Sequence, residues 1–116
     1  FAAPINMFSL AYPEKSSNWT NRFKMFATQN MWTFILLDSY NGRLWQVQYS
    51  TQDLDNLFCI PINTNELVEN NERCIFSIQP LTSMYQYYLI NDNTGDMWKF
   101  QWSTKGDDYR WIERFR

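Results

Sequence analysis

The chain contains two copies of one sequence pattern, and this duplication constrains its fold more than any other feature. A shift of 53 positions places the first copy on the second without a gap. The identical pairs are Phe23/Phe76, Met31/Met84, Leu36/Leu89, Gly42/Gly95, Trp45/Trp98, Gln48/Gln101, Ser50/Ser103, Thr51/Thr104 and Asp55/Asp108. An ungapped match of this kind indicates a repeated structural unit. We therefore predict one compact domain with an extended N-terminal segment (1–21), a first β repeat (22–63), a connector (64–74) and a second β repeat (75–116).

Each copy predicts four short strands. The predicted strands cover about 22–27, 32–38, 43–49 and 57–62 in the first copy, and about 75–80, 85–91, 96–102 and 110–115 in the second. Asn41-Gly42 and Thr94-Gly95 are hairpin signals, because glycine adopts the positive φ of such a turn at little cost. Aromatic residues, which favour strands, make up 19% of the chain. The expected fold class is all-β.

The alternation of apolar residues predicts how the sheets pack. The second strand of each copy is apolar on both faces, with Phe34 on one side and Ile35 on the other. A strand buried on both faces lies inside a layered structure, and we expect Phe23 and Met25 of the first strand to point inward. One four-stranded antiparallel sheet per copy satisfies the pattern, packed as a sandwich or as two propeller-like blades. Two blades do not close a ring, so the propeller alternative requires a homo-oligomer.

The composition argues against several kinds of chemistry. The chain has no histidine, the commonest general base and zinc ligand. The net charge is −2 and no basic stripe is present, which argues against a nucleic-acid partner. No apolar run approaches the roughly 20 residues of a membrane span. We therefore predict no catalytic residue, metal, cofactor, nucleic-acid partner or membrane span. An enzyme that uses Asp55 or Asp108 is the alternative, and the sequence leaves the cellular compartment open.

Recurrent aromatic and glutamine residues are the candidate ligand-binding positions. They are Trp45, Gln48, Tyr49, Trp98, Gln101 and Trp102. An indole face stacks on a sugar or a peptide, and a glutamine both donates and accepts hydrogen bonds. The alternative is structural: Trp45 and Trp98 anchor the core, and the glutamines are ordinary strand residues.

Two cysteines, Cys59 and Cys74, are too few to define a disulfide framework. They either face each other across adjacent strands or are two small buried residues, and the second interpretation is favoured.

The segment Leu36-Leu37-Asp38, continued by Gly42-Arg43-Leu44-Trp45-Gln46-Val47-Gln48-Tyr49-Ser50, resembles a motif of an uncharacterised family of small bacterial β-repeat proteins. Their repeats carry leucine-leucine-aspartate, three residues, then glycine-arginine-x-tryptophan-glutamine-valine-glutamine, an aromatic residue and serine. The second copy departs from the motif at Asn91, Asp96 and Lys99. The resemblance covers nearly all of the chain beyond the first twenty residues. It implies a bacterial origin, and it implies no activity.

The sequence therefore favours a non-catalytic binding or assembly module that uses its aromatic sheet faces, with a glycan or a protein as the ligand. The alternative is a structural subunit whose aromatic faces are buried in a homo-oligomer or a larger assembly.

Overall fold

Two four-stranded antiparallel sheets form the protein. The structure is a computed structural model and describes residues 22–49, 57–68 and 75–116. The first sheet consists of β1 (Phe23–Ala27), β2 (Thr33–Asp38), β3 (Arg43–Gln48) and β4 (Phe58–Asn63). The second consists of β5 (Phe76–Pro80), β6 (Gln86–Asn91), β7 (Met97–Gln101) and β8 (Trp111–Arg114), with a 3-10 turn, η3 (Asp107–Tyr109), before β8. The predicted all-β fold, built from a duplicated four-stranded unit, is confirmed.

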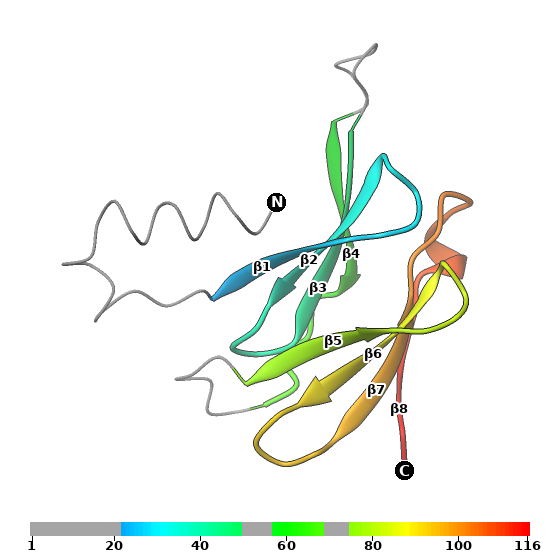
Figure 1. Ribbon diagram of the computed structural model, residues 1–116. Coiled ribbons are helices and arrows are strands. Elements are labelled where there is room, and N and C mark those ends of the chain that lie inside the picture. Colours follow the sequence, from blue (N-terminus) through cyan, green and yellow to red (C-terminus); the bar gives the residue numbers. More distant parts are fainter. Residues whose placement is uncertain (1–21, 50–56, 69–74) are drawn as a thin grey trace, which may run out of the picture.

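Both sheets are simple meanders, in which each strand pairs antiparallel with the next. Figure 1 shows the sheets stacked one below the other, with β5 under β1, β6 under β2 and β7 under β3. The strand registers repeat with the sequence: Leu36 lies opposite Trp45, and Leu89 lies opposite Trp98. The shift of 53 positions therefore holds in the backbone pairing as well as in the sequence.

The two hairpin turns also repeat. Gly42 and Gly95 have φ values of 86° and 79°, the left-handed region in which glycine is favoured. The Gly42 N–H donates to the Asp38 carbonyl at 2.9 Å, and the Gly95 N–H donates to the Asn91 carbonyl at 2.7 Å. The two hairpins thus have the same backbone geometry.

Each sheet has two different faces. We call the side that carries Trp45 or Trp98 the front face and the opposite side the back face. The front faces carry Phe23, Met25, Phe34, Leu36, Trp45, Val47 and Tyr49 in the first sheet, and Phe76, Ile78, Tyr87, Leu89, Trp98, Phe100 and Trp102 in the second. The back faces carry Thr33, Ile35, Leu37, Leu44, Gln46 and Gln48 in the first sheet, and Gln86, Tyr88, Ile90, Met97, Lys99 and Gln101 in the second.

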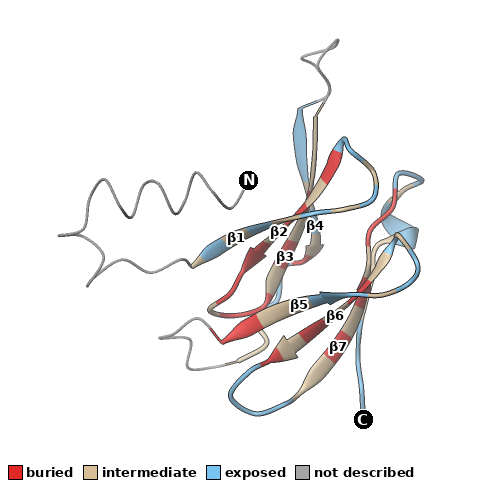
Figure 2. Cartoon of the chain, viewed as in Figure 1, coloured by how far each residue is buried: buried red, intermediate tan, exposed pale blue. Residues whose placement is uncertain are grey.

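The hydrophobic core lies between the back face of the first sheet and the front face of the second. Ile35, Leu37 and Leu44 are 0% exposed on one side of it, and Phe76 and Trp102 are 1% and 0% exposed on the other. Figure 2 shows the buried residues concentrated along β2 and β3 and along β5 to β7. The sheets therefore stack head to tail, front against back, rather than as a symmetric pair that buries equivalent faces.

This arrangement corrects the prediction that the second strand of each copy is buried on both faces. Phe34 and Leu36 are only half-buried in β2, and so are Tyr88 and Ile90 in β6. The reason is that each sheet has a neighbouring sheet on one side only.

Polar contacts at the sheet interface orient one sheet on the other. The side chain of Gln46 is fully buried, and its Oε1 accepts a hydrogen bond from the Ser103 N–H at 3.1 Å. At the hairpin end, the Ser39 carbonyl accepts from the N–H groups of Ile75 and Phe76 at 2.9 and 3.0 Å. Each buried acceptor that is paired in this way avoids a desolvation penalty of about 1–3 kcal/mol. The interface is therefore specific as well as apolar.

Alanine substitutions at the two turn glycines will separate backbone strain from interface packing. A Cβ at Gly42 would lie 2.7 Å from Leu67 Cδ1 and 3.2 Å from Phe76 Cε2, whereas a Cβ at Gly95 meets nothing within 4 Å. We expect Gly95→Ala to lower the free energy of unfolding by about 1 kcal/mol through the positive φ. We expect Gly42→Ala to cost about 1–3 kcal/mol more through overpacking. Denaturant unfolding of both variants measures the difference, and equal losses would contradict the head-to-tail packing.

Candidate functional site

The six residues predicted to bind a ligand do not form one site. Trp98 and Trp102 are 7% and 0% exposed and belong to the core, so their assignment to a ligand site is corrected. The Trp102 indole N–H donates to the Met84 carbonyl at 2.9 Å, which satisfies its polar group inside the protein. Trp45 and Tyr49, their counterparts in the first sheet, are half-buried on the front face.

The two glutamines lie on the back faces, away from the aromatic residues of their own copy. Gln48 Oε1 accepts from Gln46 Nε2 at 3.3 Å. The Gln101 amide accepts from Gln86 at 2.9 Å and donates to the Tyr109 carbonyl at 2.9 Å. Both amides thus bind neighbouring groups of the protein, and neither lies beside Trp45 or Tyr49.

The front face of the first sheet is an apolar surface that no described sheet covers. Phe23 and Met25 of β1 are 54% and 48% exposed, against the prediction that both point inward. Aromatic rings contact one another on the same face: the ring centres of Phe23 and Trp45 are 6.4 Å apart, and those of Phe34 and Tyr49 are 6.0 Å apart. Exposed apolar patches of this kind mark interaction sites. Sequence reasoning missed Phe23 and Met25 because the alternation of a strand does not say which of its faces another sheet covers.

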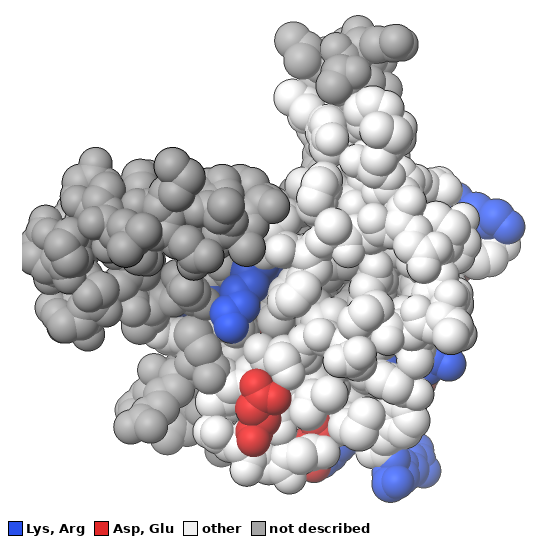
Figure 3. Space-filling model, viewed as in Figure 1, with Lys and Arg blue, Asp and Glu red and all other residues white. Residues whose placement is uncertain are grey.

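The front face of the first sheet carries charged side chains only at its hairpin end, where Asp38 and Arg43 lie beside Phe23. The other residues of β1 to β4 on this side, together with Tyr49, are Phe23, Met25, Ala27, Phe34, Leu36, Trp45, Val47, Tyr49, Cys59 and Pro61. Charged side chains also occupy only isolated spots on the described surface that Figure 3 shows. Such a face favours an apolar ligand surface.

An ion pair lies at the rim of this face. Arg22 Nε donates to Asp38 Oδ1 at 2.9 Å, and Arg22 Nη2 donates to Asp38 Oδ2 at 2.9 Å. The hydrogen bond with Asp38 raises the pKa of Arg22. The guanidinium also lies 4.8 Å from the centre of the Tyr40 ring. Asp38 is buried, and this bidentate pairing compensates its charge.

Cys59 lies on the same front face, opposite Val47 in the pairing of β3 and β4. It is a free, exposed thiol, so the expectation of a buried Cys59 is wrong. Partial burial nevertheless raises the pKa of the thiol above its ordinary value. Cys59 forms no disulfide, and Cys74 lies outside the described residues.

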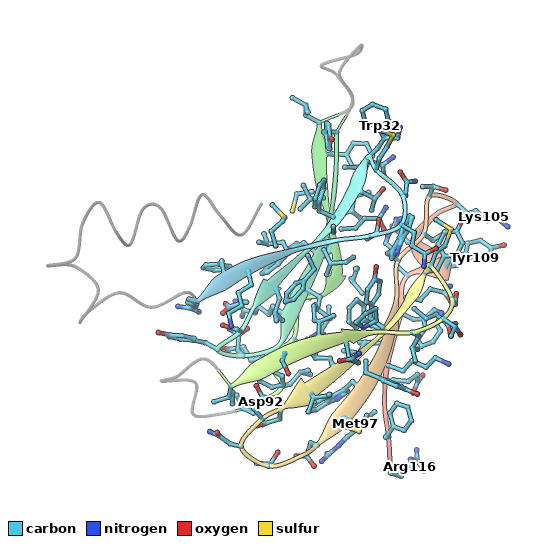
Figure 4. All side chains as sticks on the ribbon, viewed as in Figure 1. Trp32, Asp92, Met97, Lys105, Tyr109 and Arg116 are labelled. Atoms are coloured by element: carbon cyan, nitrogen blue, oxygen red, sulfur yellow. The ribbon has the colours of Figure 1, made fainter. Side chains whose placement is uncertain are left out.

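A shallow pocket lies at one end of the second sheet, between the turn that precedes β6 and the loop that precedes β8. Its volume is about 200 Å³, and its lining includes Tyr85, Gln101, Lys105 and Tyr109. Figure 4 shows Lys105 and Tyr109 close together at this end. The volume is below the range of about 300–1,000 Å³ that small-molecule sites usually have, and the Gln101 amide is engaged. We therefore regard the front face of the first sheet as the stronger candidate.

Within residues 22–49, 57–68 and 75–116, no group of three or more Cys, Asp or Glu side chains is placed to hold a metal ion. In the same ranges, no helix is long and apolar enough to span a membrane.

Comparison with known proteins finds no matching family model, no matching curated protein and no matching solved structure. The resemblance to small bacterial β-repeat proteins therefore stays a prediction from the motif.

Alanine substitutions at one equivalent position in each sheet will measure the difference between the two front faces. Phe76 is 1% exposed and Phe23 is 54% exposed. We expect Phe76→Ala to lower the free energy of unfolding by about 3–5 kcal/mol, because it leaves a cavity in the core. Phe23→Ala should cost about 1 kcal/mol or less. Denaturant unfolding at low protein concentration checks this, and a similar loss in both variants would show that the first front face is covered within the single chain.

The reactivity of Cys59 will report its surroundings. Because burial raises the pKa of the thiol, less of it is the reactive thiolate at neutral pH. In a Cys74→Ser variant, we expect the rate of Cys59 alkylation by iodoacetamide to rise with pH, with a midpoint above that of the same variant unfolded in denaturant. An equal or lower midpoint in the folded protein would contradict the burial of this thiol.

Proposed function

We propose that the chain is a non-catalytic module that binds another protein through the front face of its first sheet. The observation that carries this proposal is the contrast between equivalent residues, because Phe76 is 1% exposed beneath a neighbouring sheet whereas Phe23 is 54% exposed. The second front face shows that a surface with this side-chain pattern packs well against another β-sheet. The first front face presents nearly the same pattern to the outside.

The composition of the face favours a protein over a glycan. A sugar needs several polar groups around its hydroxyls in addition to an aromatic platform. Apart from Asp38 and Arg43 at the hairpin end, the described front face has only the Tyr49 hydroxyl, the Cys59 thiol and the Trp45 indole N–H as polar side-chain groups. An apolar protein surface requires no such partners, and its burial contributes about 25 cal/mol per Å² of apolar area.

The same composition supports a role without catalysis. Nucleophilic and acid–base catalysis require a nucleophile with an adjacent base, or a carboxylate near its substrate. The one carboxylate of the described front face, Asp38, is buried and paired with Arg22, and Cys59 is the only strong nucleophile there. The raised pKa of Cys59 opposes thiolate formation.

Photo-crosslinking from the front face tests the proposal. Benzoylphenylalanine replaces Met25, which is 48% exposed on the front face, and replaces Gln29 as a control. Gln29 lies in an exposed turn of the same sheet, and its counterpart Thr82 stays exposed in the second sheet, whose front face is covered. We expect a discrete protein adduct from position 25 and none from position 29. We also expect Trp45→Ser to abolish the adduct, because it removes an aromatic side chain from the face.

A glycan array with the wild-type protein and the Trp45→Ser variant is the matching control. Glycan binding that depends on Trp45, or crosslinking without a difference between positions 25 and 29, would overturn the proposal of a protein ligand.

A further inference from the structure

Within the part of the chain that the structure describes, one front face and one back face are uncovered, and these two surfaces are the counterparts of the two that already pack together. The front face of the second sheet is covered by the back face of the first, where Ile35, Leu37 and Leu44 are 0% exposed. The counterparts of these three residues are Tyr88, Ile90 and Met97, on the back face of the second sheet. At one end of the stack, a front face thus has no back face packed on it. At the other end, a back face has no front face packed on it.

The uncovered back face keeps apolar residues at the positions that correspond to the centre of the covered one. Tyr88, Ile90 and Met97 are half-buried on the outer side of the second sheet. Figure 4 shows Met97 at the bottom of the view, remote from the first sheet. The Tyr88 ring packs edge-on against Phe115 with 5.5 Å between ring centres, which extends the apolar area toward the C-terminus.

This back face is more polar than the covered one, because Gln79, Lys99 and Glu113 occupy the positions of Phe26, Gln46 and Ile60. Lys99 replaces Gln46, whose Oε1 accepts the Ser103 N–H in the interface between the sheets. A lysine ammonium has no acceptor, so it does not reproduce this hydrogen bond. Its aliphatic stem can instead lie along an aromatic face with the ammonium over a ring, and the first front face supplies such rings at Phe34 and Tyr49.

We propose that the protein bound by the front face of the first sheet is a second copy of this chain, which contributes the back face of its second sheet. This rests on the proposed function, because it names the partner of the same surface. The contact repeats between chains the front-to-back packing that joins the two sheets within one chain. Because the two surfaces differ, the association is heterologous, and it continues until a ring closes or a filament forms.

A complementation experiment tests this proposal. Met25→Arg places a charge on the uncovered front face, and Met97→Arg places one on the uncovered back face. We expect the wild-type chain to sediment at a multiple of its 14.1 kDa mass, and each variant alone to sediment as a monomer. An equimolar mixture of the two variants should form a one-to-one dimer, because each still has one intact surface and neither dimer end can grow.

Matched variants keep the test decisive. Gln29→Arg, in the exposed turn of the first sheet, should assemble as the wild type does. If circular dichroism shows that Met25→Arg does not fold, Phe23→Arg takes its place. Wild-type assembly that persists in Met97→Arg would overturn the proposal in favour of a front-to-front dimer. A wild-type monomer at high concentration would overturn it as well.

The crosslinking experiment separates this failure from failure of the proposed function. If the wild type is a monomer and position 25 still gives a Trp45-dependent adduct with a different protein, the front face binds proteins and the self-association is wrong. If the wild type is a monomer and position 25 gives no adduct, both proposals are wrong.

Discussion

Burial of the back face of the first sheet against the front face of the second is the interaction on which the rest of the structure depends. Each sheet is apolar on both sides, so it has two surfaces that favour burial. Two sheets stacked once cover two of their four faces. The core residues Ile35, Leu44, Phe76 and Trp102 all lie in this single contact. The remaining two faces are left for solvent or for a partner, and they are different surfaces because the stack is head to tail.

This packing places equivalent residues in different environments. Gly42 lies against Leu67 and Phe76, whereas Gly95 has open space around it. Asn41 is 0% exposed in the first hairpin, and its counterpart Thr94 is exposed in the second. The backbone of the two hairpins is nevertheless the same, because the turn is determined locally by a glycine at positive φ. Local geometry and tertiary environment are therefore independent in this fold.

The sequence predicted the parts of the structure that local patterns determine. The strands, the glycine hairpins and the pairing of four strands per copy follow from alternation, turn residues and the repeat, and all appear in the structure. The candidate site could not be predicted in the same way. Trp45 and Trp98 occupy the same position in equivalent strands, but only the packing of whole sheets decides that Trp98 is 7% exposed while Trp45 is half-buried on an outer face. No local signal carries that information.

The differences between the copies nevertheless follow the packing once it is known. On the back faces, the fully buried Gln46 of the first sheet corresponds to Lys99 in the second, and Ile60 corresponds to Glu113. A back face without a sheet against it thus tolerates charge. On the front faces, the uncovered face of the first sheet keeps Phe23 and Trp45, and its charged residues Asp38 and Arg43 are confined to the hairpin end. A surface that only faced water would gain nothing from this aromatic composition. The retained apolar character of the first front face is therefore the strongest argument that it is an interface. The second back face has an apolar centre with charged positions beside it. Such an amphipathic surface suits a contact that forms between separate chains.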